Sequence, residues 1–197
     1  NYNVAVGYSA GSAVTTGIQN TLIGGLAGDA LTDADQNVAI GYAALTADTL
    51  GSKSVAIGRE ALVTQNFTTA TDAHNVAVGA NAGQVVTTGV RNTLMGSLAG
   101  DAFTDADRNT AIGFAALSTD TLGSGSTAVG SGALFTQNFT TATDAFNTAV
   151  GFEAGLSVTT GRFNSLIGGL AGDAFTTGEH NTALGYQALT SDTAGSR

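Results

Sequence analysis

The pentapeptide NTAIG at Asn109–Gly113 decides the fold, because near-copies of it recur along the whole chain. Eleven copies begin with Asn or Ser and end with Gly. Their first residues are Asn3, Asn20, Asn37, Ser54, Asn75, Asn92, Asn109, Ser126, Asn147, Asn164 and Asn181. Successive copies lie 17, 17, 17 and 21 residues apart, and this series repeats with a superperiod of 72 residues. The chain is therefore an array of one repeated structural unit.

A unit of 17 residues is too short for the helix pair of a helical solenoid, so we expect it to be extended. A segment such as Thr110–Ile112 predicts a short strand that ends at the bend of Gly113, and Leu50–Ser52 predicts a return turn. The sequence thus predicts an all-β fold, a parallel β-solenoid or β-roll of about eleven rungs of 17 or 21 residues. Each rung would carry two short strands, and the rod would be roughly 50 Å long.

Two apolar positions of the repeat predict how each rung is covered. The fourth residue is always apolar, as at Ile23 and Ile112, and we expect it to fill the core. The third is always Ala or Leu, as at Ala5 and Leu22, and strand alternation places it on the opposite face. A second apolar face favours cover by neighbouring copies of the chain. The alternative is a wider rung whose return strand covers this ladder.

The composition excludes several classes of protein. Six basic residues against fifteen acidic ones give a net charge of −9, which disfavours nucleic acid and anionic membranes as partners. The sequence contains no run of 18 apolar residues, so membrane insertion of this segment is not predicted. The absence of Cys excludes disulfides and thiolate metal sites. Twenty-eight Gly without any Pro exclude collagen.

Two stretches carry a resemblance to known families. They are SVAIG followed by Arg59-Glu60-Ala61, and NTAIG followed by Phe114-Ala115-Ala116-Leu117. The repeat resembles the head repeat of trimeric autotransporter adhesins and, equally, repeats of bacteriophage tail fibres, and the resemblance covers the entire chain. It implies a left-handed parallel β-roll in which three chains lie side by side. It also implies a fibre that projects from a surface and binds host or matrix.

Acidic clusters are weak candidates for calcium sites. Their carboxylates are Asp29, Asp33 and Asp35 in the first superperiod, and Asp101, Asp105 and Asp107 in the second. Closely spaced carboxylates suit calcium, but the third superperiod keeps only Asp173 at the corresponding place. A solvated turn is the favoured interpretation. No metal and no cofactor is therefore predicted.

Aromatic residues are the candidate ligand-binding positions. Five of them directly follow the motif Gly: Tyr8, Tyr42, Phe114, Phe152 and Tyr186. They could stack on sugars, although packing against a neighbouring rung is the ordinary alternative. The repeated stretch QNFTTATDA lengthens two units, and we expect exposed loops there around Phe67 and Phe139, about 19 Å apart along the rod.

Other patterns are assigned structural roles. Thr occupies the thirteenth position of every 17-residue unit, as at Thr15 and Thr32, and a row one Thr wide favours a hydroxyl ladder over an ice-binding surface. His74 and His180 occupy equivalent positions without a fixed Ser or carboxylate partner, so no catalytic residue and no enzyme activity is predicted.

The sequence therefore favours a structural and adhesive fibre or filament segment, outside the cell or on a virion. The alternative is a receptor- or carbohydrate-binding module. Residues 1–197 form a single repeat array without a cap at either end, which predicts a segment of a longer fibre or a subunit that stacks end to end. The expected partners are further copies of the chain, laterally as a trimer or end to end, and a host surface glycan or matrix protein.

Overall fold

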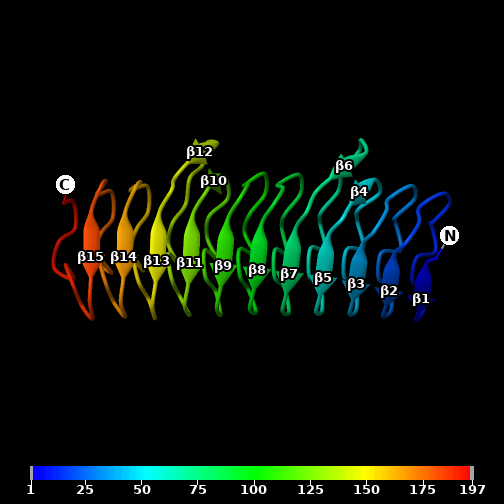
Figure 1. The fold of residues 1–197 in the computed structure, drawn as a ribbon, viewed down its shortest axis with the longest axis horizontal. Coiled ribbons are helices and arrows are strands. Elements are labelled where there is room, and N and C mark those ends of the chain that lie inside the picture. Colours follow the sequence, from blue (N-terminus) through cyan, green and yellow to red (C-terminus); the bar gives the residue numbers. More distant parts are fainter. Residues whose placement is uncertain (1, 196–197) are drawn as a thin grey trace.

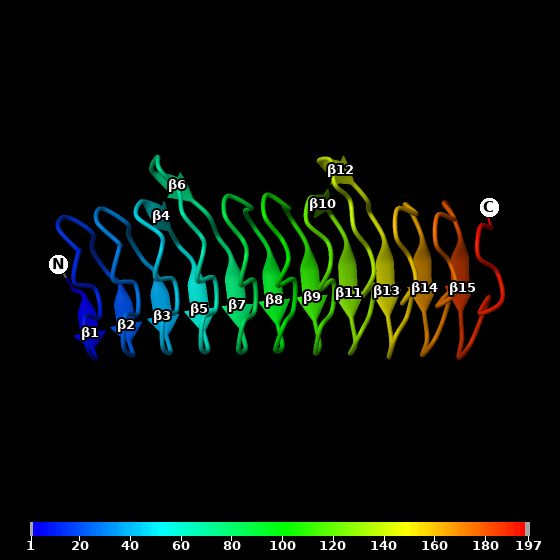
Figure 2. The same cartoon turned by 180° about the vertical axis from the view of Figure 1, so that it is seen from behind.

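The computed structural model describes residues 2–195, and this part of the chain forms fifteen β-strands and no helix. The chain winds into coils that stack along one axis, and together they form a straight rod (Figures 1 and 2). Each coil contributes one strand to a parallel sheet of eleven strands that runs the length of the rod. The predicted all-β parallel solenoid is therefore confirmed.

The strands of this sheet are three residues long and coincide with the second to fourth residues of each motif. They are β1 (Val4–Val6), β2 (Thr21–Ile23), β3 (Val38–Ile40), β5 (Val55–Ile57), β7 (Val76–Val78), β8 (Thr93–Met95), β9 (Thr110–Ile112), β11 (Thr127–Val129), β13 (Thr148–Val150), β14 (Ser165–Ile167) and β15 (Thr182–Leu184). Equivalent positions pair directly, as Ala128 does with Ala111 and Ala149. Stacking of like on like explains why the repeat is so regular.

The expectation of two strands in each coil is wrong for most coils. The return segment consists of turns, because residues with positive φ such as Gln36 (60°) and Leu45 (54°) bend it repeatedly. Its backbone still bonds to the next coil, for example from Thr15 N to Thr32 O at 3.0 Å. Short extra strands occur only beside the two long units. They are β4 (Gly51–Ser52) with β6 (Thr71–Asp72), and β10 (Gly123–Ser124) with β12 (Thr143–Asp144).

The core contains the third residue of every motif after the first, whose Ala5 is exposed, and the fourth faces outward, so the predicted assignment of the two faces is reversed. Leu22 and Ala111 are fully buried, whereas Ile23 and Met95 expose 38% and 42% of their surface. Ile112 is half-buried. The first residue of a motif, such as Asn92, is buried and bonds to the return segment, and side chains alternate along a strand, so the third residue shares this inner face. The fourth residue is thereby placed on the outer face of the sheet.

The core is filled by complementary large and small residues. Where the third residue is Leu, the ninth residue of the same coil and of the coil before it is Gly. A Cβ on Gly83 would meet Leu94 Cδ1 at 2.7 Å, and one on Gly100 would meet Leu94 Cδ2 at 2.8 Å. Where the third residue is Ala, as at Ala111, the ninth residue can be Leu, as at Leu117. Both are fully buried. The coils thus keep a constant cross-section although their residues differ.

The Gly that ends each motif is required by the close approach of neighbouring coils. Gly96 has a φ of 132°, and a Cβ there would lie 2.4 Å from the carbonyl oxygen of Gly113. No side chain fits this contact, so every unit carries Gly at this position.

Buried Asn side chains hold the start of each coil. Asn92 Nδ2 donates to the carbonyl of Ala106 at 2.7 Å, close to the end of its own unit. Asn92 Oδ1 accepts the backbone N–H of Asn109 at 2.9 Å. The side chain therefore joins a coil both to itself and to the next coil, which satisfies backbone groups that no strand pairs.

The two long units replace this Asn by Ser and use a different buried network. Gln65 Nε2 donates to Ser54 Oγ at 3.1 Å and to Asp48 Oδ2 at 2.6 Å, while Gln65 Oε1 accepts Asn75 Nδ2 at 2.9 Å. Gln137 joins Asp120, Ser126 and Asn147 in the same way one superperiod later. The short Ser side chain leaves space for the Gln that the longer unit brings into the core.

The Thr ladder is confirmed as a hydroxyl ladder in a turn. Thr32 Oγ1 donates to the carbonyl of Thr49 at 3.1 Å, and Thr104 Oγ1 donates to that of Thr121 at 3.1 Å. Because these hydroxyls bond along the rod, they stabilise the turn instead of presenting a regular outward row.

Candidate functional surfaces

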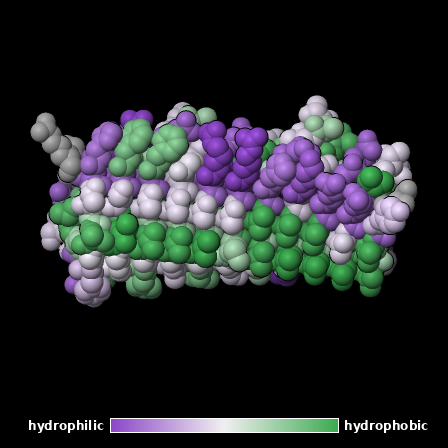
Figure 3. Space-filling view, viewed as in Figure 1, coloured by the Kyte–Doolittle hydropathy of each residue, from purple (hydrophilic) through white to green (hydrophobic). Residues whose placement is uncertain are grey.

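The fourth residues form an aliphatic ladder along the outer face of the sheet. Figure 3 shows an apolar band that follows the length of the rod. The ladder consists of Val6, Ile23, Ile40, Ile57, Val78, Met95, Ile112, Val129, Val150, Ile167 and Leu184. Each of them is half-buried or exposed. In the N-terminal half, second-position residues such as Val38 and Val76 widen the band, whereas Thr110 and Thr148 occupy this position in the C-terminal half. Unpartnered apolar faces of this extent mark interaction surfaces.

The five aromatic residues after the motif Gly are all exposed. Tyr8 and Tyr186 expose 82% and 73% of their surface, and Tyr42, Phe114 and Phe152 expose more than half. Tyr42 lies within 3.6 Å of where a Cβ on Gly25 would stand, and Tyr186 within 3.5 Å of the same point on Gly169. These two rings therefore rest on the Gly of the coil before them and leave their other face to solvent.

The long units protrude from the rod, as the positions of β6 and β12 in Figure 1 show. Residues 68–70 and 140–142 at their tips are exposed, so the prediction of exposed loops is confirmed. The placement of the two aromatic rings in these loops is wrong: Phe67 and Phe139 are each only 6% exposed. The backbone N–H of Phe67 donates to Asp48 Oδ1 at 3.1 Å, which holds the residue inward. Neither ring is available to a ligand.

The six calcium candidates are engaged in bonds to neighbouring coils. Asp33 Oδ1 accepts Thr16 Oγ1 at 2.5 Å, and Asp35 Oδ1 accepts the backbone N–H of Ile18 at 2.8 Å. Asp29 accepts the hydroxyl of Thr46. Asp101, Asp105 and Asp107 make the corresponding bonds one superperiod later. Within residues 2–195 no three metal-ligating side chains come together.

An aromatic stack that the sequence analysis did not single out lies in the C-terminal third. Phe163 stacks between Phe146 and His180, with ring centroids 5.9 Å and 4.9 Å away. The guanidinium of Arg162 lies 5.4 Å from the centre of the Phe163 ring and pairs with Glu179 at 2.9 Å. The common position of these residues, directly before the motif Asn, was the available signal. His180 thus acts as a stacking ring.

Three carboxyl groups are unusually placed for acidic residues. Burial raises the pKa of Asp48 and of Asp120 above the ordinary 3.8, although hydrogen bonds from Gln65 and Gln137 oppose this in part. Burial also raises the pKa of Asp101, against a hydrogen bond from Ser118. Asp48 and Asp120 both precede a long unit, and each accepts hydrogen bonds from the Gln side chain and from a Phe backbone N–H of that unit.

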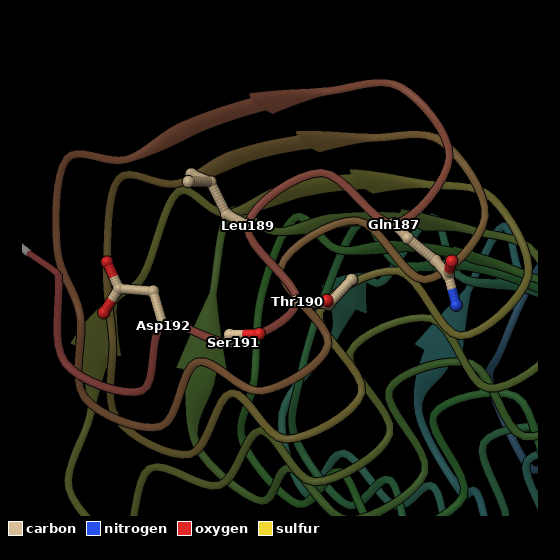
Figure 4. A pocket seen from close by; sticks show the side chains of 5 residues that line it. All are labelled: Gln187, Leu189, Thr190, Ser191 and Asp192. Carbon is tan, nitrogen blue, oxygen red and sulfur yellow. The ribbon is translucent and has the colours of Figure 1, made fainter.

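A hollow of about 530 Å³ lies on the last described coil, where Gln187, Leu189, Thr190, Ser191 and Asp192 line it (Figure 4). Leu189 and Asp192 occupy the repeat positions of Leu45 and Asp48, which are fully buried where another coil follows. The hollow therefore lies on the side of the last described coil that faces away from the other coils.

A second hollow, of about 250 Å³, lies on the flank of the rod next to one of the exposed aromatic residues. Its lining is Phe114, Ala115, Ser131, Gly132, Phe135, Glu153 and Leu156. The side chains come from three successive coils. Phe114 and Ala115 belong to the first coil, and Glu153 and Leu156 belong to the third. Phe114, one of the five predicted aromatic residues, thus lines this hollow.

Comparisons with known protein families, with curated proteins and with solved structures found no match for this chain. In the part of the chain described, no helix has the length and apolar character needed to cross a membrane. The candidate surfaces of the rod are therefore the basis for the functional proposals.

Proposed function

We propose that this chain is a structural segment of a fibre, located outside the cell on a cell or virion surface, and that copies of it associate side by side. The observation that supports the proposal is the aliphatic ladder on the outer face of the sheet. Ile167 and Met95 expose 43% and 42% of their surface on a single chain. Lateral contact would bury these residues along the whole rod.

The size of the apolar band suits such an association. Eleven coils at about 4.8 Å give a length of roughly 50 Å, and the second and fourth residues give a width of about 12 Å. The resulting sheet face is on the order of 600 Å² on each chain, and its apolar part is smaller, because the second residues are Thr or Ser in the C-terminal half. Each partner in a standard interface contributes roughly 800 Å². Three parallel chains that turn this face toward a common axis would form the proposed trimer.

A pair of matched variants tests this proposal. Met95→Asp places a charge in the ladder, and Val85→Asp places one on a residue that is equally exposed, 41% against 42%, but lies outside the sheet. Because both sites are exposed on a single chain, neither change should prevent folding. In sedimentation velocity, Met95→Asp should dissociate the assembly and Val85→Asp should not. Equal masses for the two variants would count against the sheet face as the interface.

End-to-end stacking is a second proposed mode of self-association. The sheet strands β1 and β15 have a neighbour on one side only, so their backbone groups can pair with another strand. Pairing of Thr182–Leu184 in one copy with Val4–Val6 in the next would continue the register of the sheet. Electron microscopy would reveal filaments longer than one chain.

Binding of a receptor or carbohydrate is a second candidate function, supported by the exposed aromatic rings. Tyr42 and Phe114 expose 56% and 58% of their surface. A free ring face is the platform on which sugar rings stack. Glycan-array binding that is lost on Tyr42→Ala and Phe114→Ala would support this function, and an array without any signal would oppose it.

A further inference from the structure

The hollow beside Phe114 exists because one coil carries two small residues between larger neighbours. Gly132 and Ser131 form its floor, with Phe114 on the preceding coil, Glu153 and Leu156 on the following coil, and Phe135 on the same coil. Gly132 is the one Gly in a ladder of seventh residues that otherwise carry side chains in the described part of the rod. The open space is therefore a feature of this coil alone.

The preceding superperiod shows what fills the same place elsewhere in the rod. There, Glu60 stands where Gly132 does, and Arg59 where Ser131 does. Arg59 pairs with the carboxylate of Glu60 at 2.8 Å, and Asn81 and Gln84 donate to it at 3.2 Å each. This part of the rod thus carries a carboxylate together with its cation.

The hollow beside Phe114 also has a carboxylate, on the following coil, but it lacks the cation. Glu153 replaces Asn81, and its carboxylate makes no hydrogen bond or ion pair with any residue that the structure describes. None of the residues that line the hollow is basic. Apolar side chains complete the change, with Phe135 and Leu156 in place of Val63 and Gln84.

The chemistry of the lining selects one class of ligand. A carboxylate attracts a cation, and the face of a Phe ring also attracts a cation whose shell is apolar. Metal ions would require several oxygen ligands, and this hollow offers one carboxylate among hydrocarbon groups. The net charge of −9 raises the local concentration of any cation. A volume of about 250 Å³ limits the ligand to one small head group.

We propose that the hollow formed by Phe114, Phe135, Glu153 and Leu156 over Gly132 binds an organic ammonium group, such as an alkylammonium or a quaternary ammonium head group. Glu153 supplies the counter-charge, and the two Phe rings and Leu156 contact the alkyl groups. This site does not depend on self-association, and it shares only Phe114 with the proposed glycan-binding surface.

A pair of isosteric probes tests the role of charge. Choline carries the cation, and 3,3-dimethylbutan-1-ol has the same shape without it. In calorimetric or NMR titrations of the full chain, we expect choline to bind at one site with at least about tenfold higher affinity than the neutral alcohol. Equal affinities, or the absence of choline binding, would overturn the proposal.

Variants of the lining test the location. Glu153→Gln removes the charge and Phe114→Ala removes a wall, and both should weaken choline binding by about tenfold. Gly132→Leu fills the hollow and should abolish binding. It should still fold, because Leu134 and Leu117 already adopt a positive φ in this rod. Tyr42→Ala is the matched control in the preceding superperiod and should leave binding unchanged. Binding that survives Gly132→Leu would place the site elsewhere.

Two sources could supply the same head group. Free choline and phosphatidylcholine vesicles distinguish a soluble ligand from a lipid surface. Binding to choline alone would identify a small soluble cation, and co-sedimentation with vesicles that Glu153→Gln abolishes would identify a lipid head group. Vesicle binding that Glu153→Gln leaves intact would contradict the proposed site.

Discussion

At the scale of single residues, Asn92 shows how the rod satisfies its backbone. The side chain is fully buried and bonds to Ala106 and to Asn109. We predict that Asn92→Ala lowers the free energy of unfolding by about 2–4 kcal/mol, because two buried backbone groups lose their partners. Urea denaturation followed by circular dichroism measures this. The control is Gln36→Ala, an exposed change expected to stay within about 0.5 kcal/mol; comparable losses for both variants would refute the ladder's role.

Asp48 and Asp120 make stability depend on pH in a direction opposite to that of most carboxyl groups. Because burial raises their pKa in the folded chain, their ionisation opposes folding. Their contribution is therefore fully present below the ordinary pKa of 3.8 and is lost as pH rises through the raised folded pKa. Asp72 behaves in the opposite way, since a hydrogen bond from Lys53 lowers its pKa. Its contribution to stability is fully present above pH 3.8 and is lost as the pH falls below that value.

We accordingly predict that these two carboxyl groups stabilise the chain as pH falls from 7 toward about 4.5. The measurement is the urea midpoint at both pH values, for the unmodified chain and for the double variant Asp48→Asn, Asp120→Asn. The variant can lose overall stability, because its amides fit the Gln network less well. On acidification from pH 7 to about 4.5, the urea midpoint of the variant should nevertheless rise less, or fall more, than that of the unmodified chain. If the midpoint shifted equally between the two pH values in the variant and in the unmodified chain, other groups would control the pH dependence.

At the scale of the strand, inward and outward positions alternate within three residues, and adjacent positions of β8 make this measurable. Leu94 is fully buried and Met95 is 42% exposed. We predict that Leu94→Ala costs about 2–5 kcal/mol through the cavity that it leaves, whereas Met95→Ala costs less than about 1 kcal/mol on the single chain. Denaturation at low protein concentration separates these effects from association. The reverse order of losses would restore the original assignment of faces.

The sequence was sufficient to predict the coil, its period and its parallel stacking, because like positions must lie on one another. It was not sufficient to assign the two faces. Both Ala111 and Ile112 are apolar, and three residues are too few for alternation to identify the inner one. The aliphatic Ile suggested the core, yet the inner position takes Ala in some coils and a Leu of similar size, such as Leu94, in others, so side-chain size does not identify it. A stronger signal was available at Asn109, since a buried polar ladder must share the inner face with the third residue.

The hollow beside Phe114 was predicted only in part, because it too depends on a comparison between repeats. The exposure of Phe114 follows from its place after the motif Gly. The hollow beside it depends on Gly132, which looks like any other Gly until it is compared with Glu60 one superperiod earlier. Phe67 and Phe139 were misplaced because the polar residues around them indicated a loop, whereas the buried carboxylates of Asp48 and Asp120 draw their backbone inward.

At the scale of the whole molecule, we propose that the rod is a subunit whose outer sheet face contacts further copies. Within residues 2–195, this face leaves aliphatic residues half-buried or exposed along the length of the rod. The proposed self-association would explain why the fourth position stays apolar in all eleven units.

Sedimentation equilibrium of the unmodified chain tests this claim most directly. A single chain has a mass of 19.4 kDa. The account predicts a particle of three times that mass, stable to dilution and converted to single chains by Met95→Asp. A mass of 19.4 kDa that persists as the protein concentration is raised would contradict it.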